Sequence, residues 1–328
     1  MHLDSIDRKL VDLVQVAFPI SERPYADLGF RMGRDESEVI RRIGRLKDEG
    51  IVRQISPVLD ARRLGYQTTL VAMRAKESQL QAVESVIGEH PGVSHGYERD
   101  HHFNIWFTLS VRSGVDFQSE LEKLSGNIDV DAVFVLPAVQ IFKIGAYFKM
   151  GDGEDQERTG NARMASSALP GMAELEPIDR CIINNLQEDL PLTPTPFAAK
   201  AEALGITPEE LVARCKLLWQ QGIIRRFGAF INHRKAGYEA NAMACWAAPI
   251  DAVDVVGQKL ASMPEVSHCY ERQTNPLWQY NLFSMLHCHC KEACRRRVND
   301  ISRLVGITDY VVIFSTREFK KIRVKYLV

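Results

Sequence analysis

Two seven-residue segments of the chain carry the same set of chemically active side chains. They are VSHGYER at 93–99 and VSHCYER at 266–272. Alternate side chains of a β-strand lie on one face, so the histidine, tyrosine and arginine of each segment should project together. An imidazole can transfer protons, a phenol can donate one, and a guanidinium binds carboxylates. The candidate catalytic residues are therefore His95, Tyr97, Arg99, His268, Tyr270 and Arg272.

Duplication alone is the other explanation of the shared triplet. A histidine on a strand is often a hydrogen-bonded structural residue. The sequence leaves both interpretations open.

The turns that follow these segments differ between the copies. The first turn contains His101 and His102, whereas the second runs through QTNPLWQYN at 273–281. Adjacent imidazoles cannot both point the same way, so we expect one of the two to be an axial iron ligand, with His101 also a candidate proton donor. A polar turn with two solvated rings is the alternative. In the second turn, Trp278 and Tyr280 followed by Asn281 predict an aromatic wall for a macrocycle.

The C-terminal run STREFKKIRVKYLV is strongly basic, with Glu318 as its one acid. In an extended segment Arg317, Lys321, Arg323 and Lys325 would lie on one side, which suits a ligand with several carboxylates. A solvated edge strand that uses lysine against aggregation is the alternative. The complete set of expected basic substrate-binding residues is Arg225, Arg226, Arg317, Lys320, Lys321 and Arg323.

The composition is that of an ordinary globular protein long enough for about two domains. Of 328 residues, 45% are hydrophobic, and 41 Lys and Arg stand against 42 Asp and Glu, a net charge of -1. An anionic partner must therefore be bound by a local cluster. No apolar run approaches the ~20 residues of a membrane span and the N-terminus lacks a signal-peptide core, so we expect a cytoplasmic protein without membrane contact.

The seven cysteines all lie in the second half of the chain. Their odd number and the absence of a C-x-x-C pair argue against a disulfide framework. His287 to Cys290, with Cys294, do not match the spacing of a metal or iron–sulfur site.

The chain repeats itself, which sets its domain organisation. LDSIDRKLVDLV at 3–14 returns as LEPIDRCIINNL at 175–186, and helical spacing gives way in each copy to a βαββαβ order. We predict an α+β protein with two tandem copies of a winged helix-turn-helix and a ferredoxin-like αβ domain. The expected bounds are 1–65 and 66–150 for copy one, a linker at 151–173, and 174–237 and 238–328 for copy two.

The helix-turn-helix units give weak electrostatic support for DNA binding. The third helix of copy one offers Arg41, Arg42, Arg45 and Lys47, but acids in the same segment offset them. We expect these units to be retained for packing, with no DNA partner.

The strings GIIRRFGAFINHRKAGY, VSHCYERQTNPLWQYNLFSMLH and FSTREFKKIRVKYL closely resemble the siroheme decarboxylases, enzymes with the fold of AsnC-type (leucine-responsive) regulators. The first half, with SHGYERDHHFNIWF, resembles the partner subunit, so the chain looks like a fusion of two subunits. One departure is Gln279, where we expect the family to favour proline.

The resemblance implies decarboxylation of the C12 and C18 acetates of siroheme to 12,18-didecarboxysiroheme and CO2, on the route to heme d1 or to heme. It implies no cofactor beyond the iron of the substrate, and siroheme and its products as partners. The alternative is an AsnC-type regulator that senses heme or another tetrapyrrole.

The pairing of the two copies bears on the number of sites. Each βαββαβ unit should leave one sheet face uncovered, and the two faces can meet in a pseudo-symmetric arrangement. We therefore expect one composite pocket, and we allow a homo-oligomer through the open sheets.

Overall fold

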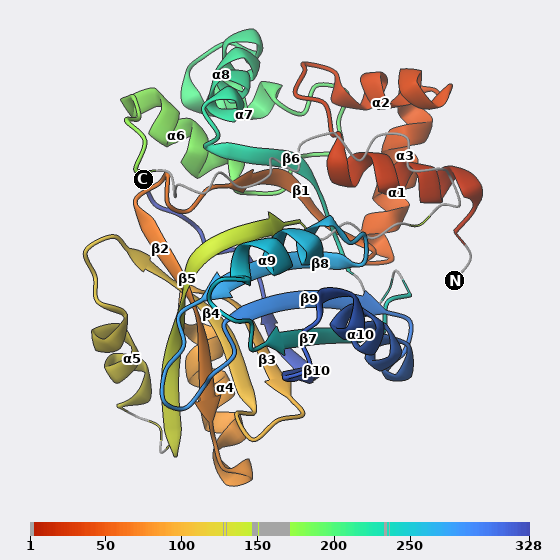
Figure 1. Cartoon of the computed structure of the whole chain (residues 1–328). Helices are drawn as coiled ribbons and strands as arrows, with labels where there is room; N and C mark the ends of the chain where they lie inside the picture. The colour runs from red at the N-terminus through yellow and green to blue at the C-terminus, as the bar shows by residue number, and fades with distance from the viewer. Residues whose placement is uncertain are drawn as a thin grey trace.

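The computed structural model describes residues 3–126, 128, 130–145, 150, 171–232, 235 and 237–328. Most of the expected linker, at 151–170, lies outside the described residues. The rest folds into a helical layer above a β-barrel (Figure 1). The two predicted kinds of unit are both present, twice each.

Three helices open each copy, as predicted. They are α1 (Ser5–Val16), α2 (Pro24–Met32) and α3 (Glu36–Asp48), then α6 (Pro177–Leu186), α7 (Ala198–Leu204) and α8 (Pro208–Gln220). Asp4 begins α1 by accepting a hydrogen bond from the Asp7 amide at 2.7 Å, and Thr207 caps α8 through the Glu210 amide at 3.2 Å. Gly33 ends α2 in the left-handed conformation at φ 63°.

The strand after each third helix pairs with its counterpart from the other copy. β1 (Val52–Leu59) and β6 (Ile224–Ile231) form an antiparallel two-stranded ribbon, and both helical units share one apolar core. A Cβ on Gly228 would lie 2.7 Å from the backbone oxygens of Val14 and Gln15, so only glycine lets β6 pass α1 this closely. The predicted wings are thus a single ribbon made by both copies.

The two αβ units have the predicted βαββαβ order. Copy one contains β2 (Tyr66–Arg74), η1 (Glu77–Gln79), α4 (Leu80–Glu89), β3 (Val93–Arg99), β4 (Ile105–Arg112), α5 (Phe117–Ser125) and β5 (Ala132–Ile144). Copy two contains β7 (Ala240–Trp246), α9 (Val253–Ser262), β8 (Val266–Arg272), β9 (Leu282–Cys288), α10 (Lys291–Val305) and β10 (Tyr310–Lys321).

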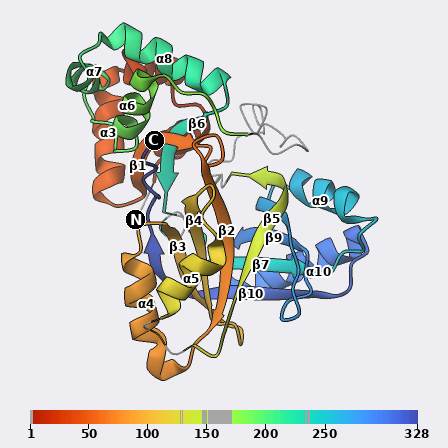
Figure 2. The same cartoon turned by 90° about the vertical axis from the view of Figure 1, so that its left-hand side faces the viewer.

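The last strand of each copy joins the two sheets edge to edge. β5 pairs with β2 over residues 132–137 and then with β8 over 138–144. β10 pairs with β7 over 310–314 and then with β3 over 315–321. The eight strands close into a barrel in the order β10-β3-β4-β2-β5-β8-β9-β7. Figure 2 shows α4 and α5 on one side of this barrel and α9 and α10 on the other.

Barrel closure makes the expected pairing of the two sheets internal to one chain. Their inner faces meet and their edges are joined, so the described barrel strands have no free edge. The β1–β6 ribbon is a separate two-stranded sheet, and a homo-oligomer stays a prediction. None of the described helices has the length and apolar character that a membrane span requires.

The structure adds one disulfide that we did not expect. Cys288, at the end of β9, is bonded to Cys294, one turn into α10, because the intervening turn brings the two side chains together. Five cysteines remain free, so no disulfide framework is formed. The described residues contain no group of three or more His, Cys, Asp or Glu side chains arranged to hold a metal.

Candidate active site

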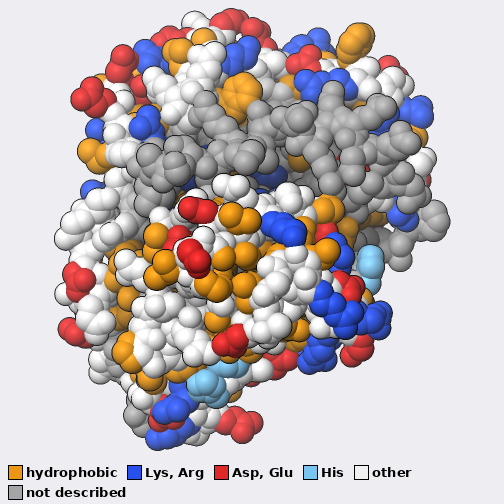
Figure 3. Space-filling view, viewed as in Figure 1, with side chains coloured by type: hydrophobic (Ala, Val, Ile, Leu, Met, Phe, Trp, Pro, Cys, Tyr) orange, Lys and Arg blue, Asp and Glu red, His pale blue; other side chains and the backbone are white. Residues whose placement is uncertain are grey.

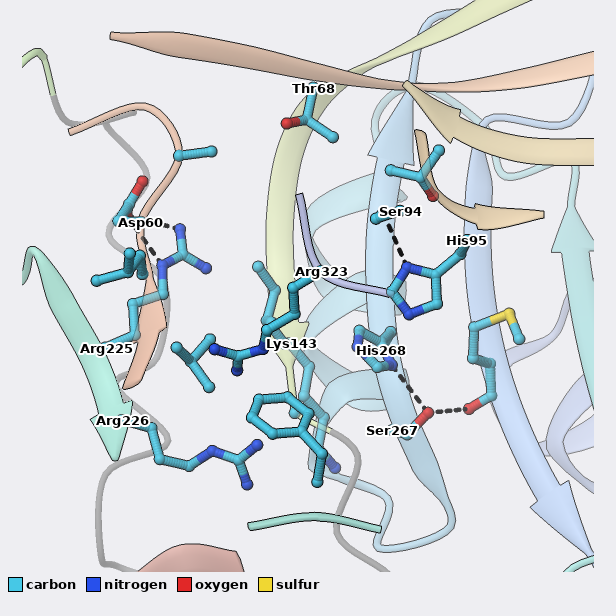
Figure 4. Close-up of a pocket in the computed structure, with 18 of the residues that line it drawn as sticks. Asp60, Thr68, Ser94, His95, Lys143, Arg225, Arg226, Ser267, His268 and Arg323 are labelled. Atoms are coloured by element: carbon cyan, nitrogen blue, oxygen red, sulfur yellow. Dashed lines mark hydrogen bonds and ion pairs between the residues drawn. The ribbon is translucent and has the colours of Figure 1, made fainter. Parts of the chain in front are cut away.

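A single large cavity lies between the open end of the barrel and the β1–β6 ribbon. Its volume is about 3240 Å³, and residues of both copies line it. Figure 4 shows His95 and His268 on one side of this space and Arg225 and Arg226 reaching into it from the other. The pocket is therefore built jointly by the two copies.

The triplets of β3 and β8 line this cavity from pseudo-equivalent positions. The ring centroids of His95 and Tyr97 are 6.4 Å apart and those of His268 and Tyr270 are 6.2 Å apart, with each pair stacked. The prediction that alternate residues of each segment share a face is confirmed.

The arginines of the two triplets form the inner wall of the cavity. Arg99 donates to the Ile313 carbonyl at 3.3 Å and lies over the Tyr97 ring. Arg272 donates to the Leu136 carbonyl at 2.8 Å and lies 4.7 Å from the Tyr270 ring centroid. Burial lowers the pKa of Arg272 to about 10, so it remains a cation at neutral pH.

The two imidazoles are neutral. Burial, together with the charge of Lys321, lowers the pKa of His95 to about 4, and burial, together with nearby positive groups, lowers that of His268 to about 4. The Nδ1 atom of His95 lies 2.9 Å from the Ser94 Oγ, and that of His268 lies 3.0 Å from the Ser267 Oγ. Each ring is thereby held through Nδ1.

The cavity wall is strongly cationic. Among the residues that the structure describes, thirteen Lys and Arg line it against three acids, Asp12, Asp60 and Glu265. Because the net charge of the chain is near zero, an anionic ligand has to be bound by a local group of cations. The excess of Lys and Arg in this wall is such a group.

Four of the expected basic residues, Arg225, Arg226, Lys321 and Arg323, lie in this wall, and each already has a partner. Arg225 donates to Asp60 at 2.7 and 2.9 Å, and Arg226 donates to the Gln15 carbonyl at 2.7 Å. Arg323 contacts the Pro57 carbonyl and lies 3.5 Å from the Phe230 ring centroid. Burial lowers the pKa of Arg226 to about 10 and that of Arg323 to about 9. Arg226 and Arg323 therefore remain positive at neutral pH.

Several lining residues were not predicted from the sequence. Ser94 and Ser267 precede the histidines in both copies, so the repeat itself contained the signal for them. His287 also lines the cavity, although the sequence drew attention to it only as part of the His287 to Cys290 group. Lys143 and Arg53 line it too, and no pattern in the sequence marked these two.

The turn histidines lie away from the cavity, which corrects our expectation about the iron ligand. His101 accepts a hydrogen bond from the Phe103 amide and packs 5.5 Å from the Trp278 ring, and His102 is exposed. Neither lines the cavity. The β3–β4 turn lies at the opposite end of the strand from His95, so the geometry favours His95 and His268 as the imidazoles that meet a ligand.

The expected aromatic wall is part of the barrel core. Trp278 is 3% exposed and packs on Trp106 and Phe134 at ring distances of 5.1 and 6.1 Å. Tyr280 packs against Trp278, and Asn281 bonds both backbone groups of Ala248. None of the three expected residues lines the cavity, because this loop folds over the closed end of the barrel.

The C-terminal basic row is divided between two faces. Register shifts in β10 between Ser315 and Arg317 and between Glu318 and Lys320 break the alternation that we assumed. Arg317 is exposed and pairs with Glu84 and Glu98. Lys320 donates to the His90 carbonyl at 2.7 Å, outside the cavity. Only Lys321 and the residues after it reach the pocket.

Three of the four basic residues that we named on α3, namely Arg42, Arg45 and Lys47, are held in ion pairs. Arg42 bonds Asp4, Asp7 and Glu38, and Arg45 bonds Asp7. Basic side chains also gather on the surface over α10 (Figure 3), outside the cavity. The structure thus adds no support for a DNA-binding surface on α3.

The comparisons with known proteins agree with this architecture. The AsnC-like ligand binding domain matches residues 63–143 and 235–320, and the siroheme decarboxylase NirDL-like HTH domain matches 7–53 and 179–225. A siroheme decarboxylase of Hydrogenobacter thermophilus is 35% identical over 97% of this chain and 94% of its own length. The beta subunit of the Methanosarcina barkeri enzyme is 44% identical over 46% of this chain and 99% of its own length.

A solved structure extends the similarity to three dimensions. The crystal structure of the siroheme decarboxylase NirDL in complex with an iron-uroporphyrin III analogue superposes with a TM-score of 0.72 at 31% identity. It covers 99% of this chain and 95% of that chain. By its two domain models, its full-length relatives and its fold, the chain belongs to the siroheme decarboxylase family.

Proposed function

We propose that the chain removes the carboxyl groups of the C12 and C18 acetates of siroheme, giving 12,18-didecarboxysiroheme and two CO2. The observation that carries the proposal is the single cavity lined by both His-Tyr-Arg triplets and by a large excess of cations. Siroheme carries eight carboxylates, and the thirteen Lys and Arg that line the described part of the pocket can pair with several of them at once.

The candidate substrate-binding cations are those of the cavity wall. Arg225, Arg226 and Arg323 approach from the ribbon and the C-terminal segment, and Lys321 and Lys143 from the barrel. Apolar side chains such as Leu70, Ile141 and Met285 share the wall, which suits the faces of a macrocycle. We accordingly withdraw Trp278, Tyr280, Asn281, Arg317 and Lys320 from the substrate-binding set.

Each decarboxylation breaks one C–C bond and forms one C–H bond. The electron pair of the bond to the carboxylate passes into the substrate macrocycle as CO2 leaves, and a proton then adds to the methylene carbon to give a methyl group. His95 and Tyr97 are the candidate donors on one side of the cavity and Tyr270 on the other. Burial raises the pKa of Tyr270, which keeps this phenol protonated. Substrate carboxylates placed beside His95 would raise the pKa of its imidazole towards the working pH.

Anaerobic incubation with siroheme tests the proposal. Mass analysis should show losses of about 44 and then about 88 mass units, one and two CO2. Unchanged siroheme together with specific operator binding would instead support the tetrapyrrole-sensing regulator. Arg42 and Arg45 of α3 are already paired with Asp7, which weakens the case for DNA binding and favours the enzyme.

A further inference from the structure

His95 and His268 differ in the hydrogen bonds made by the serine that contacts the Nδ1 atom of each ring. The Ser267 Oγ, 3.0 Å from the His268 Nδ1, also lies 3.2 Å from the Met285 carbonyl and 3.1 Å from the His287 Nε2. The Ser94 Oγ has only the His95 Nδ1 as a partner among the described residues. At the position of His287, copy one has Ser110, which bonds Thr68 at 2.9 Å.

The three contacts of Ser267 determine where its proton lies. A hydroxyl has one hydrogen and two acceptor lone pairs, and a backbone carbonyl can only accept. All three contacts are satisfied in one arrangement, in which the hydroxyl donates to the Met285 carbonyl and accepts from both rings. The Nδ1 of His268 then carries the hydrogen of the neutral ring, and its Nε2 carries the lone pair.

Copy one imposes no such choice. The Ser94 hydroxyl can turn to donate to the His95 Nδ1 or to accept from it, because no carbonyl bond occupies its hydrogen. Either nitrogen of His95 can therefore carry the proton. The pseudo-equivalent imidazoles are thus chemically different although their strands are matched.

We propose that Ser267, itself held by His287, is a positioning residue that presents the Nε2 lone pair of His268 to the cavity as the axial ligand of the substrate iron. A metal-bound imidazole commonly donates its other N–H to an acceptor, which fixes the ring and strengthens the metal bond. The Nε2 of His268 makes no hydrogen bond among the described residues, and it belongs to a ring that lines the cavity. This inference rests on the proposed function for the identity of the iron compound.

The first experiment reads the tautomers without any ligand. Nitrogen-15 NMR of histidine-labelled protein should show His268 with its proton on Nδ1. Ser267→Ala should abolish this preference, whereas Ser267→Thr, which keeps the hydroxyl, should retain it. Ser94→Ala is the matched control and should leave His268 unchanged. A proton on Nε2 of His268 in the parent protein would overturn the proposal.

The second experiment compares iron uroporphyrin with metal-free uroporphyrin as probes. His268→Ala should remove the low-spin absorption of the bound iron compound, and added imidazole should restore it, whereas His95→Ala should keep it. Ser267→Ala should weaken binding of the iron compound about 10-fold or more and leave the metal-free affinity unchanged. Loss of the low-spin spectrum in His95→Ala alone, or equal weakening for both probes in Ser267→Ala, would contradict the inference.

Neither measurement requires turnover. A parent protein that shows the tautomer and the iron spectrum but releases no CO2 from siroheme would refute the proposed function and leave the assignment of His268 standing.

Discussion

Lys321 lies opposite His95 across the antiparallel pairing of β10 with β3. The equivalent neighbour of His268, on β5, is Ile144. One imidazole therefore has an ammonium group on the adjoining strand and the other has an aliphatic chain. This asymmetry arises where the two copies exchange strands, and it gives the two sides of one cavity different electrostatic surroundings.

Replacing Lys321 with isoleucine, the residue type that lies beside His268, should raise the pKa of His95. Burial is the larger cause of the low value, about 4, and the charge of Lys321 is the next. Lys321→Ile removes a like charge from the neighbourhood of His95, which favours the imidazolium. NMR titration of the His95 ring should show the upward shift. Lys325→Ala is the control, and a shift of equal size there would show that the effect is not specific to the neighbouring strand.

The composite pocket predicts how the two decarboxylations respond to mutation. Because both triplets line one cavity, at least one of His95→Ala and His268→Ala should impair both steps. Quantifying the mono- and didecarboxylated products over time measures each step. Two independent sites would instead give a clean split, with each variant stopping one decarboxylation and sparing the other.

Arg226 should contribute to substrate affinity, whereas Arg317 should not. Arg226→Gln introduces the residue that copy one has at this position, Gln54, and removes a cavity cation. We expect binding to weaken by about 1.5 to 3 kcal/mol for a lost charged hydrogen bond. Arg317→Gln, on the outer face, should bind as the parent does. Fluorescence quenching by iron uroporphyrin gives both affinities, and equal losses would argue against the division of the basic row.

The turn histidines should be dispensable for iron binding. His102 is exposed and His101 bonds its own turn, so Ala at either position should leave the absorption of bound iron uroporphyrin unchanged. The absorption spectrum of each variant measures this directly. If one of them lost the low-spin bands, the turn would have to approach the ligand, contrary to the geometry of the cavity.

Trp278 should matter for stability more than for chemistry. Trp278→Ala removes a side chain that packs on Trp106, Phe134 and Phe283, and the free energy of unfolding should fall by about 3 to 5 kcal/mol. Urea unfolding measures this loss. The neighbouring Leu277 is 53% exposed, so Leu277→Ala should change stability by less than about 0.5 kcal/mol. Similar effects of the two substitutions would mean that the loop does not close the barrel core.

The sequence by itself determined the repeat, the order of helices and strands, and the shared face of each His-Tyr-Arg triplet. These features follow from short-range rules, since side chains alternate along a strand and recur at helical spacing within a few residues. The specific strings around His268 and the C-terminal run also led to the correct family.

Only the tertiary structure decided which chemically suitable residues share the cavity. His101 and Trp278 have plausible side chains, but the closure of the barrel places their turns away from the pocket. The register shifts of β10 divide Arg317 from Lys321, and strand exchange between the copies places Lys321 beside His95 and Ile144 beside His268. Such pairings join residues that are far apart in the chain. They are selected by the free energy of joining whole sheets, so the local sequence pattern does not predict them.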